Sequence, residues 1–190
     1  MPEGPEIDTE RLQESIHEPP SDSLLRNIAL TTALLAACGA VAALRAGGTV
    51  NEALVLKTEA GRLQAEASDQ WAYYQAKGIK ANIQEGTRAT WLVAGKTPPS
   101  NIELSIQRYT AEQKDIERIA RDKEHLRDEA SQEADRLLAR HHRFANSVAL
   151  LQVAIALGAV AALTRQRSIW GGSAILGLLG TGLLVLTLLG

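Results

Sequence analysis

Three uncharged apolar runs divide this chain. They cover residues 28–44, 144–164 and 169–190, and none of them contains an Asp, Glu, Lys or Arg. As helices of about 17 to 22 residues, they match the ~30 Å hydrocarbon core of a bilayer at 1.5 Å per residue. The pattern therefore predicts three transmembrane helices, over residues 27–44, 144–164 and 169–190. For the first, alanine-rich run, a buried core helix is the alternative.

A 3-4 spacing of apolar residues predicts one long helix after the first run, from Thr49 to about Gly95. The row is apolar at six of its nine positions: Ala53, Leu56, Ala60, Leu63, Ala67, Gln70, Tyr74, Lys77 and Ala81. A second stripe widens the apolar face: Trp71, Tyr74, Gly78 and Ile79. Three glycines in this helix each cost roughly 1 kcal/mol relative to alanine, so we expect a partner to hold the helix.

Residues 96–99, which include two prolines, break this helix. A capping-box pattern from Ser100 to Glu103 then starts the next one. Its row of seam residues begins with a heptad spacing, at Ile102, Ile106, Tyr109, Gln113 and Ile116. The row is then expected to slip through Ile119 and to continue at Leu126, Ala130, Ala134, Leu137, His141 and Phe144. A slip of this kind changes the supercoil locally.

The two polar helices have matching lengths, about 47 and 43 residues, or some 65–70 Å each. Residues 45–143 are therefore predicted to form a long antiparallel, coiled-coil-like helical hairpin outside the membrane, with its tip at residues 96–101. Counting from the tip places Trp71 opposite Leu126, and Tyr74 opposite Lys123. A flexible polar linker is the alternative. The predicted fold class is an all-α membrane protein.

The N-terminal segment, residues 1–26, is acidic, with seven acids and two arginines. Asp8 or Thr9 can cap a short amphipathic helix that a pair of prolines then ends. The acidic charge is the reverse of a basic signal-peptide start. Residues 35–39 resemble a bacterial lipobox around Cys38, which leaves lipidation of that thiol open. A small packing residue in a membrane helix is the preferred interpretation of Cys38.

The basic residues of the connecting segments indicate on which side of the membrane the N-terminus and the hairpin lie. The short connection at residues 165–168 forces the last two spans into an antiparallel pair, and Trp170 is the expected interfacial anchor. The arginines of this connection, with Arg26, favour a cytoplasmic N-terminus and an extracytoplasmic hairpin. Arg45 and the basic residues 140–143 argue for the opposite orientation.

Small residues on the last two spans predict close helix packing, either within one protomer or between protomers. These residues are Gly158, Ala162, Gly177, Gly180 and Gly182.

Composition and charge argue against several classes of function. A net charge of −2 gives no electrostatic reason to expect nucleic acid. The four histidines lack metal-ligand spacing, and the chain has no phosphate-binding loop and no nucleophile motif. We therefore expect no cofactor, no metal and no enzymatic activity. His141 and His142, between two arginines, are expected to meet lipid headgroups.

The most distinctive string runs from Ser68 to Lys80. It predicts an interaction motif made of Trp71, Tyr73, Tyr74, Gln75, Lys77 and Lys80. An aromatic layer that locks the hairpin or an oligomer interface is the simpler interpretation. A ligand or partner site built on Trp71, Tyr73 and Lys77 is the alternative.

Several local strings together resemble one bacterial family. They are the start at Thr9–Glu18, the alanine-rich first span, Asn51–Ala53, the string Trp71–Lys80 and the basic connection before Trp170. In these features the chain is similar to the membrane proteins of domain of unknown function 4337, over nearly its whole length. The resemblance implies a bacterial membrane protein and brings no activity or catalytic residue. Gly86 with the nearby Trp91 departs from the family pattern.

We expect a non-enzymatic helical scaffold, or an accessory subunit of a membrane assembly, that spans the bacterial cytoplasmic membrane and self-associates. Its partners would be the lipid bilayer and either further copies or the other subunits of a larger membrane complex, not nucleic acid. The alternative is a small channel or a ligand-responsive transport component with the hairpin as a sensing cap. That function needs a polar path, for which the candidates are Gln152, Thr31, Thr32, Thr181 and Thr187.

Overall fold

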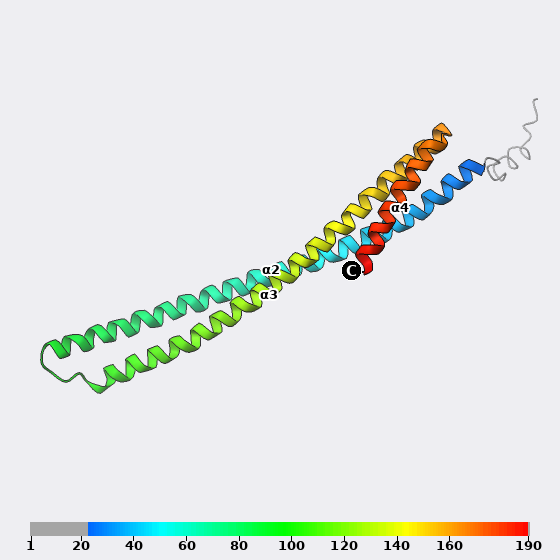
Figure 1. The fold of residues 1–190 in the computed structure, drawn as a ribbon. Coiled ribbons are helices and arrows are strands. Elements are labelled where there is room, and N and C mark those ends of the chain that lie inside the picture. The colour runs from blue at the N-terminus through cyan, green and yellow to red at the C-terminus, as the bar shows by residue number, and fades with distance from the viewer. Residues whose placement is uncertain (1–22, 190) are drawn as a thin grey trace, which may run out of the picture. The chain divides into compact units, whose positions relative to one another are not determined.

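The computed structural model describes residues 23–189, and within this range all regular secondary structure is helical. The helices are α2 (Ser23–Val93), α3 (Ser100–Thr164) and α4 (Arg167–Leu189), which can be followed in Figure 1. For the described residues, the prediction of an all-α fold is confirmed. The short amphipathic helix expected near the N-terminus lies outside the described residues.

Each of the three helices contains a segment long and apolar enough to cross a membrane. The apolar runs and the polar helices that the sequence pattern distinguishes are continuous with each other, since α2 has no break at Arg45 and α3 none at Phe144. Gly47 and Gly48 lie inside α2, although each costs roughly 1 kcal/mol there relative to alanine.

Gly95 ends α2, because it adopts a positive φ of 67° that other residues avoid. Its N–H donates to the carbonyl of Leu92 at 3.0 Å, and the N–H of Lys96 donates to the carbonyl of Trp91 at 3.0 Å. These two bonds form a Schellman motif, which satisfies the last carbonyls of the helix. After the two prolines α3 begins at Ser100, where the sequence predicts its start.

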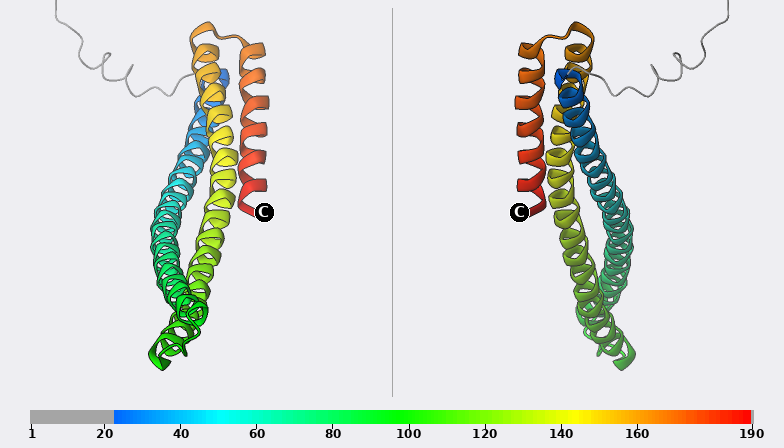
Figure 2. Two further views of the ribbon diagram at one scale, coloured as in Figure 1. Left: turned by 90° about the vertical axis from the view of Figure 1, so that its left-hand side faces the viewer. Right: turned by 90° about the vertical axis from the view of Figure 1, so that its right-hand side faces the viewer.

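The connection between α3 and α4 is shorter than that between α2 and α3. Arg165 has a positive φ of 53°, which reverses the chain within two residues. The N–H of Trp170 then donates to the carbonyl of Gln166 at 3.3 Å. Figure 2 shows α4 alongside the last part of α3, in the antiparallel arrangement that so short a connection requires.

The chain divides into two compact units. We call residues 23–47 with 140–189 the three-helix unit, and residues 48–139 the two-helix unit. In the two-helix unit α2 and α3 are antiparallel, since Lys57 pairs with Asp135 at 2.8 Å near one end and Arg88 pairs with Glu103 at 3.2 Å near the other.

The core of the three-helix unit is small and apolar, and Leu35, Cys38 and Val148 pack against it. Its buried members are Ala42, Ala46, Phe144, Leu151 and Leu184. Two buried hydroxyls join the last two helices, since Ser147 donates to the carbonyl of Gly180 at 2.7 Å and Ser173 donates to the carbonyl of Ala154 at 2.6 Å. Large apolar side chains remain exposed around this core, among them Leu30, Leu34, Leu163, Ile175, Leu178 and Leu186.

The two-helix unit is held by two facing rows, which we call the seam. On α2 all nine predicted positions of the apolar row, from Ala53 to Ala81, are buried or half-buried. On α3 the expected slip is wrong: Ala120 is fully buried, whereas Ile119 and Leu126 are 38% and 48% exposed. The heptad spacing continues without a break through Ile116, Ala120, Lys123, Arg127, Ala130 and Ala134.

Lys123 and Arg127 explain why no slip occurs. Their long side chains reach across the seam, where the Lys123 ammonium lies 2.6 Å from the Glu66 carboxylate and Arg127 donates to Gln64. With these partners two cations can occupy half-buried positions, and the helix needs no local change of supercoil.

The predicted alignment of the two helices is also wrong, by about two turns. Glu66 pairs with Lys123, and the main chain of Tyr74 contacts Gln113, whereas counting from the tip had placed Tyr74 opposite Lys123. Trp71 contacts the turn before Leu126, and Leu126 itself faces outward. The count failed because α2 ends two residues before Gly95 while α3 begins immediately after the prolines, so the loop is not symmetric about them.

Candidate functional site

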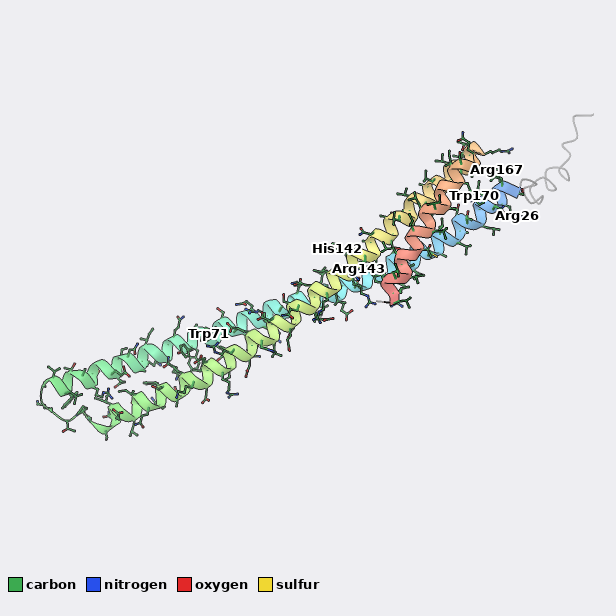
Figure 3. The ribbon with its side chains drawn as sticks, viewed as in Figure 1. Arg26, Trp71, His142, Arg143, Arg167 and Trp170 are labelled. Carbon is green, nitrogen blue, oxygen red and sulfur yellow. The ribbon has the colours of Figure 1, made fainter. Side chains whose placement is uncertain are left out.

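The aromatic string of α2 meets charged residues of α3 in the middle of the two-helix unit (Figure 3, Trp71). The indole N–H of Trp71 donates to the Glu124 carboxylate at 2.9 Å. The Tyr74 ring meets the Trp71 ring edge to face, with centroids 5.5 Å apart. The Arg121 guanidinium lies 5.8 Å from the centre of the Trp71 ring and is itself held by Glu117 at 2.8 Å.

Lys77 occupies a half-buried seam position one turn farther along α2. Its ammonium lies 2.5 Å from the Glu112 carboxylate, 4.9 Å from the centre of the Tyr73 ring and 5.7 Å from that of Tyr109. The hydrogen bond with Glu112, with a further one to Tyr73, raises the pKa of Lys77 above its ordinary value. The same bond from Lys77 lowers the pKa of Glu112. Lys77 is thus already engaged by its own chain.

Gly78 allows the two helices to approach each other closely at this level. A Cβ at this position would lie 2.6 Å from the side-chain nitrogen of Gln113. That nitrogen donates to the carbonyl of Tyr74 at 3.3 Å. The glycine therefore leaves room for a side-chain bond between the helices, which offsets part of its cost to α2.

The structure separates the predicted interaction motif into two faces. Trp71, Tyr74 and Lys77 are half-buried in or beside the seam, where they contact α3. Tyr73 is half exposed, and Gln75 and Lys80 are exposed. The three inner residues form an aromatic and ionic layer between the helices.

The predicted packing glycines of the spans are brought together, with one exception. A Cβ on Gly158 would lie 2.7 Å from Thr32, one on Gly177 2.5 Å from Leu35, and one on Gly180 2.9 Å from Leu151. Ala162, four residues after Gly158 on α3, is half-buried. Gly182 is exposed with nothing within 4 Å, so it makes no packing contact within this protomer, and packing between protomers at Gly182 stays a prediction. It follows Gly180 by two residues, which turns it to the other side of the helix.

The polar residues of the predicted spans bond mainly to their own helices or neighbours. Thr31 donates to the carbonyl of Ile28 at 3.0 Å and accepts from the Trp170 indole at 3.1 Å. Thr187 donates to the carbonyl of Leu183 at 2.8 Å. Trp170, which is labelled in Figure 3, thus joins α4 to α2, and its expected role as an interfacial anchor stays a prediction.

Basic residues of α3 contact the other two helices of the three-helix unit. The Nδ1–H of His141 donates to the carbonyl of Ala46 at 2.9 Å. The centres of the His141 and His142 rings are 5.5 Å apart. Arg140 donates to the carbonyl of Thr187 at 3.4 Å. Sequence reasoning expected both histidines at lipid headgroups and missed these bonds, because no local pattern shows which carbonyl a side chain will meet.

Within residues 23–189 no three His, Cys, Asp or Glu side chains are grouped so that they could hold a metal ion. A shallow, open pocket of about 180 Å³ lies where α2 ends, lined by Thr90, Trp91, Ala94 and Lys96. Its lining residues carry one cationic side chain, that of Lys96, and one hydroxyl, that of Thr90. The contacts of the aromatic layer join α2 to α3 within the two-helix unit.

Comparison with known proteins agrees with the resemblance seen in the sequence. The chain matches no curated protein and no solved structure. Residues 24–190 match the family model described as Domain of unknown function (DUF4337). Because this match covers most of the chain, the protein belongs to the DUF4337 family.

Proposed function

We propose that this protein is a non-enzymatic, self-associating helical scaffold anchored in the bacterial cytoplasmic membrane. Residues 27–44, 144–164 and 169–190 would span the bilayer, and residues 45–143 would form the coiled-coil-like hairpin outside it. The N-terminus would lie in the cytoplasm and the hairpin on the other side. The scaffold would act as a homo-oligomer or as an accessory subunit of a larger membrane assembly.

The main support for self-association is the exposed side chain of Gln152. It lies within the apolar run 144–164, it is exposed, and its carboxamide has no hydrogen-bond partner within residues 23–189. Facing lipid, an unpaired amide would cost several kcal/mol. A carboxamide carries both donors and an acceptor, so two glutamines can satisfy each other. A second copy of the chain therefore supplies a matched partner.

The residues around Gln152 suit a second helix. Ala149, Ala156 and Ala159 lie on the same side of α3 at 3-4 spacing and are exposed. Small residues of this kind let two helices approach closely in a membrane, where interhelical hydrogen bonds contribute ~0.6–2 kcal/mol. The larger exposed residues, such as Leu163, suit contact with lipid.

A transport component has less support. Its polar path would need several polar side chains to converge, but Gln152 is exposed, whereas Thr31 and Thr187 bond to carbonyls of their own helices. Thr32 packs against Gly158. The contacts of the described residues therefore favour an associating scaffold over a conducting one.

The test measures the oligomeric state of the full chain in mild detergent, by size exclusion with light scattering. We expect an oligomer whose dissociation constant rises roughly fivefold in Gln152→Leu, because its interhelical bond is lost. Gln152→Asn, which keeps a carboxamide, should lose less. Val153→Leu is the matched control, because Val153 is also exposed on the same span. A strict monomer without a co-purifying partner would overturn the proposal.

A further inference from the structure

One strip of α2 that faces away from the seam carries no charge over six heptads. In a heptad repeat whose a and d positions form the seam, the b, c and f positions point outward. The b and f positions form one strip of that side, and the c positions, which include Arg62 and Asp69, lie along its edge. In the two-helix unit all twelve b and f positions of α2 are exposed: Leu54, Thr58, Gly61, Ala65, Ser68, Ala72, Gln75, Ile79, Asn82, Gly86, Ala89 and Val93. We call these residues the outer face of α2.

The corresponding positions of α3 are different. Five of them are charged: Lys114, Arg118, Arg121, Asp128 and Asp135. This is the composition of a solvated helix face. Both helices therefore have an exposed strip at their b and f positions, but only that of α2 lacks the charged residues that keep such a surface in water.

From this contrast we propose that the outer face of α2 packs in parallel against the same face of a second copy of this chain. The inference rests on the proposed function, in which two copies share one bilayer. In that arrangement each α2 enters the two-helix unit directly after its first span, at Gly48. The outer faces of two copies would therefore begin at the same level and run in the same direction.

Charge and size both favour a second copy as the partner. Because the outer face has no charge, pairing it with itself brings no like charges together, whereas pairing the charged α3 face with itself would. The face extends over some 40 residues, or about 60 Å. A contact of that length and ~10 Å width would bury roughly 1,200 Å² in total, which exceeds the ~1,000 Å² that a specific interface needs.

The distribution of side-chain size predicts where the two helices come closest. The longest run of small residues on the face is Gly61, Ala65, Ser68 and Ala72, whereas Gly86 and Ala89 form a shorter one. Larger residues lie on both sides of the longer run, with Leu54 before it and Ile79 after it. Small residues let two backbones approach, and the larger ones fill the space where the helices diverge. We therefore expect the shortest distance between copies at Ala65 to Ala72.

Disulfide crosslinking of the full chain in membranes tests this inference. The background variant is Cys38→Ser, since Cys38 is the one cysteine of the chain. Ala65→Cys and Ala72→Cys should each give covalent dimers on mild oxidation. Ala111→Cys is the matched control, because Ala111 is exposed at an outward position of α3. Dimers at Ala111 as strong as at Ala72 would overturn the inference.

A second pair of variants measures association without a crosslink. Ala72→Glu should weaken self-association of the full chain at least roughly tenfold, because two carboxylates would meet in the interface. Ala111→Glu should leave it unchanged. An oligomer that neither crosslinks at Ala65 and Ala72 nor responds to Ala72→Glu overturns this inference and leaves the proposed function standing. A wild-type monomer overturns both.

Discussion

The indole N–H of Trp71 on α2 donates to the carboxylate of Glu124 on α3 at 2.9 Å. The two residues are 53 positions apart in the chain, so this bond exists only when the helices are correctly aligned. It lies in the layer that also holds Tyr74 and Arg121. The bond therefore reports on the integrity of the two-helix unit.

Removing this bond should destabilise the two-helix unit. Trp71→Phe keeps most of the ring contact and removes the indole donor, and we expect a loss of about 1–2 kcal/mol, because a bond to a charged acceptor is lost. Thermal unfolding of the full chain in detergent, followed by circular dichroism, measures the change. Trp91→Phe is the control, since Trp91 lies at the open pocket near the end of α2. Equal shifts in both variants would show that the Glu124 bond contributes nothing.

The Lys77–Glu112 pair should make stability depend on pH. The hydrogen bond from Lys77 lowers the pKa of Glu112, so the stabilisation from this carboxylate is present above its unfolded pKa and is lost as the pH falls through the folded pKa. The pKa of Lys77 is raised, so its contribution is present below its unfolded pKa and is lost as the pH rises through the folded pKa. Together they give a plateau from roughly pH 5 to pH 10.

Melting temperatures between pH 7 and pH 3 test the acidic side of that plateau. Glu112→Gln should flatten the decline relative to wild type, because the titrating carboxyl is gone. Glu85→Gln is the control, since Glu85 is an exposed carboxylate on α2. An acid decline that is the same in Glu112→Gln as in wild type would contradict the assignment.

Two glycines of α4 should respond differently to the same change. Gly180→Ala is expected to destabilise the three-helix unit by about 1–3 kcal/mol, because the new Cβ would lie 2.9 Å from Leu151. Gly182→Ala should be neutral or slightly stabilising, since nothing lies within 4 Å of that position. The fraction of protein that remains monodisperse after heating in detergent measures both. A loss at Gly182 equal to that at Gly180 would point to an intermolecular contact there.

The proposed side of the membrane can be read with single cysteines in the Cys38→Ser background. An impermeant maleimide should label Thr97→Cys in intact cells, because the tip of the hairpin would lie outside the cytoplasm. Ser168→Cys should be labelled only after the membrane is permeabilised. The reverse pattern would invert the proposed orientation, in the sense favoured by Arg45 and the basic residues 140–143.

The sequence predicts the α2 side of the seam well, because its apolar residues recur with one period and its polar members are few. The α3 side is harder, since Lys123 and Arg127 resemble surface residues until their partners on α2 are known. From the sequence alone, Ile119 and Leu126 therefore fit the α3 side of the seam better than the two cations do, although both are exposed in the structure. The sequence pattern of one helix does not show which residues of the partner helix lie opposite each of its positions.

The candidate site shows the same limit. The aromatic string stands out by composition alone, but which of its members face α3 depends on the alignment of two distant segments. The packing of Gly158, Gly177 and Gly180 within the protomer follows from residue size. That Gly182 makes no such contact could not be predicted, because the rotation of α4 about its axis is set by packing. The outer face of α2 follows from the predicted seam row, whereas the outward positions of α3 beyond Ile116 could be assigned only once the expected slip was corrected.

The two cations in the seam leave the pair of helices with a single stable alignment. Sliding α3 by seven residues in one direction would bring the Arg127 guanidinium toward the ammonium of Lys57, which now meets Asp135. Sliding it in the other direction would move Arg127 from Gln64 toward the bulk of Trp71. Both displaced arrangements are disfavoured by repulsion or by crowding. The position of the turn at Gly95 along the chain is consequently fixed by residues some thirty positions away from it.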